Sequence, residues 1–175
     1  MFHSDTQTLI DHWTLLAEGT AIPARAAFDP TRLGLLLPRT FMAARHEGDA
    51  VFRLAGGWIE RFHGRPLGNT GWLPLWNADS RALVAESIAR TFREARPVII
   101  VAEAGDVEAP LEIVLAPLRG PDGVPDRLLG LYVPATAEGR ELVEVESLKA
   151  RVAVGVGEVR RAPLSLAAVD GRRIA

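Results

Sequence analysis

An apolar stripe with the spacing of an α-helix lies near the start of the chain. Its members recur every three to four residues: Leu9, Ile10, Trp13 and Leu16. Ser4 and Gln7 fit a capping box before this stripe, and Gly19 is the expected end of the helix. A stripe with a tryptophan has to be buried, either against its own domain or against the same helix of a second subunit. We expect Leu9, Trp13 and Leu16 to form the dimerisation surface.

A longer helix is predicted over residues 79–96. Its apolar face is formed by Val84, Ile88, Thr91, Phe92 and Ala95. Asn77 or Asp79 can cap its start, and Pro97 cannot continue it. A shorter helix is predicted to begin after Asp29, because Pro30 stands at its first position.

Five segments have the composition of strands. They are residues 41–46, 50–54, 98–103, 110–119 and 127–133. A tight turn at 47–49 joins the first two, and Gly-rich turns join the last three. Strands joined by short turns pair antiparallel. The sequence therefore predicts an α+β fold with one five-stranded antiparallel sheet, helices on one face and an added N-terminal amphipathic helix.

The chain divides into three predicted parts. Residues 1–28 form the N-terminal helix and linker, 29–135 the core, and 136–175 a basic, partly disordered C-terminal extension. From 149 onward there are six basic and two acidic residues, on a body with excess acidic charge. Residues 138–149 fit a short helix, and no element is predicted over 152–175.

Composition removes several function classes. The chain has 175 residues and a net charge of −2, which gives no reason to expect nucleic acid as a partner. It has no cysteine, which excludes disulfides, thiolate metal sites and cysteine nucleophiles. No apolar run approaches the roughly 20 residues of a membrane span, and the first residues lack a secretion signal. We expect a cytoplasmic protein.

Two stretches resemble a compact bacterial form of the PAS domain. They are DHWTLLAEGTAIPARAAFDPTRLGLLLPRTFMA (11–43) and FRLAGGWIERFHGRPLGN (52–69), within a resemblance that covers residues 9–133. It implies a sheet in the order 2-1-5-4-3 and a role in sensing or protein interaction. Flavin-binding relatives that react through cysteine, and haem-binding relatives with histidine on the long helix, need residues that this chain lacks. No cofactor is expected, although an unidentified small ligand stays open.

Four aromatic residues lie on or beside the Gly-rich segment 56–77. They are Trp58, Phe62, Trp72 and Trp76. Either they line a pocket for a planar ligand, or they fill the space between helix and sheet. His63 is either a pocket residue or a structural histidine. Arg53 either enters the pocket and binds a carboxylate, or forms an ordinary salt bridge at the sheet edge. The histidines lack metal-site spacing, so no metal site is expected.

Three functions fit these features. The first is a non-catalytic PAS-type adaptor that dimerises and contacts a signalling or regulatory protein of unknown identity. The second is a small-molecule sensor with a planar metabolite in the core. The third, a minor enzyme, would need a reactive pair of side chains that the sequence does not present.

Overall fold

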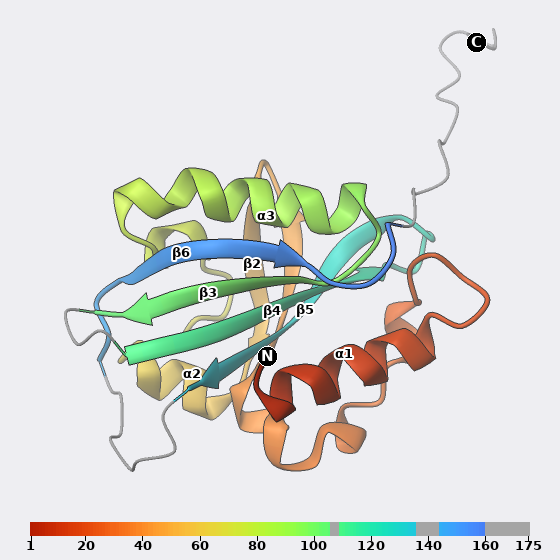
Figure 1. The fold of residues 1–175 in the computed structure, drawn as a ribbon, viewed down its shortest axis with the longest axis horizontal. Coiled ribbons are helices and arrows are strands. Elements are labelled where there is room, and N and C mark those ends of the chain that lie inside the picture. Colours follow the sequence, from red (N-terminus) through yellow and green to blue (C-terminus); the bar gives the residue numbers. More distant parts are fainter. Residues whose placement is uncertain (106–108, 136–143, 160–175) are drawn as a thin grey trace, which may run out of the picture.

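A single antiparallel sheet organises the protein. The computed structural model describes residues 1–105, 109–135 and 144–159 (Figure 1). Six strands are present in the order β2-β1-β5-β4-β3-β6. Their bounds are β1 Thr40–His46, β2 Asp49–Ala55, β3 Val98–Ala104, β4 Ala109–Arg119, β5 Pro125–Pro134 and β6 Leu148–Gly155. The predicted five-stranded order is confirmed, with β6 added beside β3.

The inner face of the sheet is covered by the connection from β2 to β3. This connection contains α2 (Gly57–Phe62), η3 (Leu73–Leu75), η4 (Ala78–Ser80) and α3 (Arg81–Arg93). The side chain of Asn77 accepts a hydrogen bond from the Ser80 backbone and so caps η4, which leads directly into α3; α3 itself follows Ser80, whose side chain forms no cap. The predicted apolar face of α3 is buried against the sheet. Figure 1 shows α3 running alongside β6 and β3.

The outer face is covered by α1 (Ser4–Leu16) and η2 (Pro30–Arg39), with η1 (Arg25–Ala27) between them. Leu9 and Trp13 are buried here, and the indole Nε1 of Trp13 donates to the Pro117 carbonyl at 2.7 Å. Leu16 is partly buried in the same cluster. The apolar stripe therefore packs on the protein's own sheet, and Leu9 and Trp13 have almost no surface left for a second subunit. Their assignment to a dimer surface has no support from this packing.

The N-terminal cap of α1 differs from the predicted capping box. His3 is the cap residue, and its Nδ1 accepts a hydrogen bond from the Asp5 backbone at 3.1 Å. The carboxylate of Glu112 on β4 accepts from the His3 backbone and, at 2.5 Å, from the Thr6 hydroxyl. The tertiary contact with β4 thus sets where the helix starts, and the local sequence motif does not.

The β1–β2 hairpin follows its predicted turn. Glu47 and Gly48 both adopt positive φ, at 45° and 86°, as a two-residue hairpin turn with the right strand twist requires. The pairing register shifts between Met42 and Ala43, so Met42 pairs with Leu54 and Ala43 with Phe52. Arg53 is left as the extra residue of a bulge on the edge strand.

The sixth strand corrects the prediction for the C-terminal part. Residues 148 and 149 belong to β6 and not to a helix, and the Val–Gly region continues as strand to Gly155. Leu148 is buried in the inner core, and the Ala150 backbone donates to the Ser80 hydroxyl at 2.9 Å. Of the rest of the predicted extension, residues 136–143 and 160–175 lie outside the described residues.

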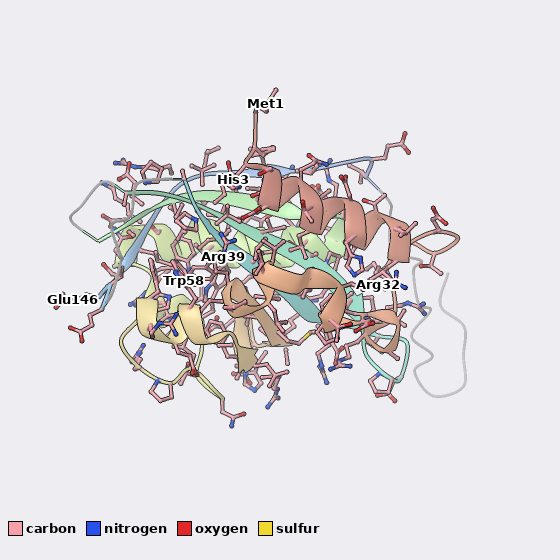
Figure 2. The ribbon with its side chains drawn as sticks, turned by 90° about the horizontal axis from the view of Figure 1, so that it is seen from below. Met1, His3, Arg32, Arg39, Trp58 and Glu146 are labelled. Atoms are coloured by element: carbon pink, nitrogen blue, oxygen red, sulfur yellow. The ribbon has the colours of Figure 1, made fainter. Side chains whose placement is uncertain are left out.

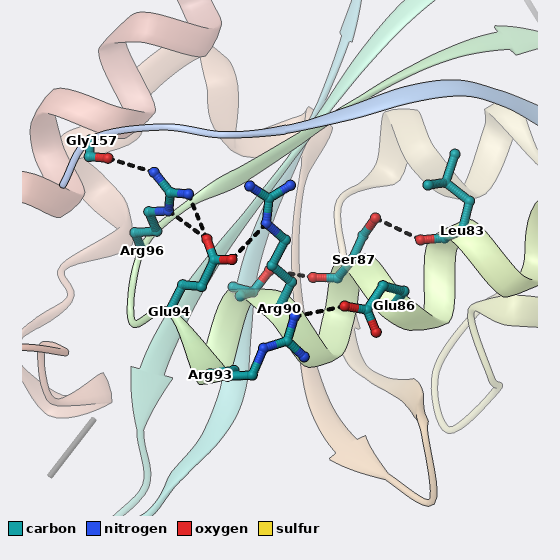
Figure 3. Close-up of polar contacts among 9 residues, drawn as sticks. Leu83, Glu86, Ser87, Arg90, Arg93, Glu94, Arg96 and Gly157 are labelled. Carbon is teal, nitrogen blue, oxygen red and sulfur yellow. Dashed lines mark hydrogen bonds and ion pairs between the residues drawn. The ribbon is translucent and has the colours of Figure 1, made fainter. Parts of the chain in front are cut away.

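Charged residues at the end of α3 hold the far end of β6 (Figure 3). The Glu94 carboxylate contacts Arg90 at 2.9 Å and Arg96 at 2.6 Å. Arg96 also donates to the Gly157 carbonyl at 2.7 Å. The Arg96 guanidinium packs directly over Gly155, 2.8 Å from where a β-carbon on that residue would lie. The strand is therefore part of the folded domain.

No helix in the described ranges has the length and apolar character needed to span a membrane.

Candidate functional site

A cluster of aromatic rings fills the space between the inner sheet face and the α2–α3 connection. Phe62, Trp72 and Trp76 have no exposed surface, and they pack with Phe41 and Tyr132 of the sheet. Trp72 contacts Trp76 edge to face at 5.2 Å between ring centroids. Three of the four predicted aromatic residues therefore belong to the core.

Trp58 is the exception among the four, because it is only half-buried. It stacks on Phe62 at a centroid distance of 5.0 Å, and Figure 2 labels its position. The structure thus brings the four aromatic residues together, as the sequence suggested. Trp58 lies at the surface end of the cluster, and the other three lie inside it. These contacts support the core-filling interpretation of the cluster.

The centre of the cluster is a small polar network. The indole Nε1 of Trp72 donates to the Tyr132 hydroxyl at 2.8 Å, and the imidazole Nε2 of His63 lies 3.3 Å from the same oxygen. These bonds satisfy polar atoms that burial removes from water. Tyr132 and Phe41 were not among the predicted site residues, since both lie on strands whose pattern indicated only core.

Burial keeps both titratable members of this network uncharged. It lowers the pKa of His63 to about 4, while the Val145 backbone acts in the opposite direction and Arg65 adds to the lowering. Burial also raises the pKa of the Tyr132 hydroxyl, against a smaller opposing effect of the Trp72 hydrogen bond. A neutral histidine beside a neutral tyrosine is a structural pair near neutral pH.

A glycine on β5 makes room for the cluster. Gly130 pairs with Phe41 across the β1–β5 ladder, and a β-carbon on Gly130 would lie 2.1 Å from the Phe41 ring. A glycine inside a strand often marks such a close approach. The ring of Phe41 can then reach Trp72 and Tyr132, at centroid distances of 5.7 and 5.8 Å.

Two buried polar atoms in the cluster, the indole Nε1 of Trp76 and the imidazole Nδ1 of His63, have no hydrogen-bond partner in the described part of the chain. The indole Nε1 of Trp76 forms no hydrogen bond with any part of the chain that the structure describes, although Trp76 is fully buried. An orphaned donor is uncommon in a folded interior, because the lost hydration costs free energy. A small bound molecule would gain a hydrogen bond at this donor or at the imidazole Nδ1 of His63.

An open cavity lies beside His63 at the edge of the cluster. Its volume is about 540 Å³, and Arg65, Leu75, Glu144 and Glu146 also line it. The backbone amide of Val145 donates to the Phe62 carbonyl at 2.7 Å, so the segment before β6 closes over α2 here. His63 therefore stands between the aromatic core and the surface.

Arg53 does not enter any of this space. Its side chain is exposed on the bulge of edge strand β2, and its Nη1 donates to the Asn69 Oδ1 at 3.3 Å. Arg53 therefore does not line the aromatic cluster, because it follows core-facing Phe52 and strand alternation places it on the other face of β2. The expected salt bridge is replaced by this amide contact.

Within residues 1–105, 109–135 and 144–159, no three His, Asp or Glu side chains are grouped so that they could hold a metal ion.

A family model of the PAS domain matches residues 1–133 of the chain. This match covers most of the 175 residues, and it includes α1 together with the first five strands. The protein belongs to the PAS domain family, as the resemblance in its sequence indicated.

Solved structures with a similar arrangement include the Rhodobacter sphaeroides LOV protein. It is 18% identical with a TM-score of 0.44, over 57% of this chain and 60% of that chain. A substituted form of RsLOV gives the same identity and TM-score over 59% and 63%. The match thus spans less than two thirds of either LOV chain. No curated protein matches the sequence.

Proposed function

We propose that this protein is a non-catalytic PAS-type signalling adaptor that works in the cytoplasm through contact with a regulatory protein, as a homodimer. PAS domains are typically sensory or signalling modules, and the chain belongs to that family. The main observation in favour of an adaptor role is that side chains fill the interior of the domain. The rings of Phe62, Trp72, Trp76 and Tyr132 occupy the space between sheet and helices without exposed surface.

The chemistry of the interior supports a non-catalytic role. Its titratable pair, His63 and Tyr132, is held neutral by burial, which lowers the pKa of the histidine and raises that of the tyrosine. A general base needs a pKa near the working pH and access to substrate. Neither group has a pKa near neutral pH, and the Tyr132 side chain is fully buried, so we assign the hydrogen bonds of this pair to holding the core together.

The surface offers apolar contact sites for a partner. Leu15 on α1, Leu83 on α3 and Val152 on β6 are exposed on three different elements. A photo-crosslinking residue at each of these positions, tested separately in cells of the source organism, should yield one regulatory protein at one position only. The adaptor role would be contradicted if the same proteins crosslinked equally well at all three positions. It would also be contradicted if the chain crosslinked only to abundant, unrelated proteins.

A second candidate function is a small-molecule sensor, and the orphaned Nε1 of Trp76 favours it. A ligand that accepts a hydrogen bond from this atom would have to displace part of the aromatic packing, and ligand binding would then shift the conformation of the domain. Native mass spectrometry of freshly purified protein tests this function. Extra mass that disappears on denaturation, and that Trp76→Phe reduces, supports the sensor, whereas a bare chain supports the adaptor.

A further inference from the structure

An unusually exposed leucine projects from the outer side of the molecule. Leu35 is 92% exposed, more than any other large apolar side chain in the described ranges except Met1. It follows Gly34, whose φ of 50° and ψ of −119° interrupt η2. Leu33 and Leu36 of the same element are buried, whereas Leu35 between them points outward directly after the interruption.

A small apolar cavity opens on the same side. Its volume is about 210 Å³. Its apolar lining includes Phe28, Pro30, Leu37, Met42, Leu54 and Leu129. The rim residues Leu37 and Leu54 are 43% and 63% exposed. An apolar cavity of about 150 Å³ can hold a benzene molecule, so this one has room for a leucine side chain.

The projection and the cavity are adjacent, because Leu35 stands two residues before Leu37, which forms part of the cavity wall. A surface that carries both a projection and a matching hollow can pair with itself about a two-fold axis. The charges on this surface are also of both signs. Arg25 lines the cavity and Asp29 is an exposed carboxylate on the same segment. Figure 2 shows η2, marked by Arg32 and Arg39, beside α1.

We propose that two copies of this chain dimerise through this surface, with Leu35 of each copy inserted into the cavity of the other. Leu9 and Trp13 of α1 are already buried within each chain. Around the cavity, the side chains with exposed apolar area that a dimer would bury lie on η2 and β2, at Leu35, Leu37 and Leu54. The proposal refines the dimeric part of the proposed function and names the surface that produces it.

The test measures the oligomeric state of the purified full chain by sedimentation velocity. Wild-type protein at about 100 µM should be a dimer, and Leu35→Asp should weaken dimerisation at least about 100-fold, because two inserted leucines are lost per dimer. Leu83→Asp is the matched control. Leu83 is a 36% exposed leucine on α3, which covers the opposite face of the sheet. This variant should stay dimeric, and circular dichroism checks that both variants are folded.

A charge swap makes the test specific for this pairing. Leu54→Lys changes the cavity rim and should also give monomers by itself. Mixing the Leu35→Asp and Leu54→Lys variants should restore a heterodimer, since one intact leucine–cavity contact remains and the two new charges attract each other.

Three results would overturn the proposal. They are a wild-type monomer at about 100 µM, a dimer that Leu35→Asp leaves intact, and failure of the mixed variants to associate. An intact dimer would point to another surface, such as the open edge of β6. The measurements use only purified protein, so their failure would leave the cellular crosslinking result for the adaptor role unaffected.

Discussion

The hydrogen-bond network at the centre of the aromatic cluster allows a quantitative test. Tyr132→Phe removes one hydroxyl and leaves the ring, so the packing of the core is preserved. The hydroxyl accepts from Trp72 Nε1 at 2.8 Å and lies 3.3 Å from His63 Nε2, and all three side chains are buried. The substitution therefore leaves two buried polar groups without this partner.

The expected magnitude follows from these two contacts. An orphaned buried group costs about 1–3 kcal/mol, and the longer contact to His63 is assigned the low end. We expect Tyr132→Phe to lower the free energy of unfolding by about 2–3 kcal/mol. Urea unfolding followed by tryptophan fluorescence measures this loss as a lower midpoint with an unchanged slope.

A double-mutant cycle with Trp72→Phe provides the control. If the Trp72–Tyr132 bond is the cause, Tyr132→Phe should cost about 1 kcal/mol less when Trp72 is already phenylalanine. A loss below about 0.5 kcal/mol for Tyr132→Phe alone, or costs that simply add in the double variant, would refute the reasoning.

Three further predictions concern the same core. Trp72→Phe and Trp76→Phe remove the same volume, but within the described residues Trp72 Nε1 is hydrogen-bonded and Trp76 Nε1 is not, so Trp72→Phe should be about 1 kcal/mol more destabilising in urea. The pKa of His63 is about 4 in the folded protein and 6.5 unfolded, so the unfolded chain binds the proton more readily. Stability should be complete above pH 6.5 and fall by up to about 3 kcal/mol as the pH drops to 4, and His63→Gln should lack that part of the pH dependence. Gly130→Ala places a β-carbon against a β1 ring and should cost about 2 kcal/mol or more, whereas Gly68→Ala, with open space around it, should cost little by thermal unfolding.

The β6 strand shows why part of the fold escaped prediction. Most of its residues are partly buried or exposed, without a clean apolar face, because it lies at the sheet edge, where α3 and η4 pack against it. From the sequence alone, the alternating Val and Gly residues of this strand therefore look like an irregular C-terminal tail. Its pairing with β3, which is more than 40 residues away in the chain, supplies the hydrogen bonds that make it a strand.

The aromatic site was partly predictable for a related reason. Trp58, Phe62, Trp72 and Trp76 lie close in sequence, so their grouping followed from the chain itself. Tyr132, which bonds Trp72, lies 60 residues away and enters the cluster only through the sheet. The bulge at Arg53 could not be foreseen either, because it depends on the register between β1 and β2.

The sequence by itself determined the elements with strong local signals. The helical stripe of α3, the turn at Glu47–Gly48 and the continuous apolar strands depend on periodicity and backbone preference, which neighbouring residues set. Only the tertiary structure decided which surface each element buries. It turned Leu9 and Trp13 inward and left Leu35 outside, because burial depends on the packing of distant segments and not on the pattern within one helix.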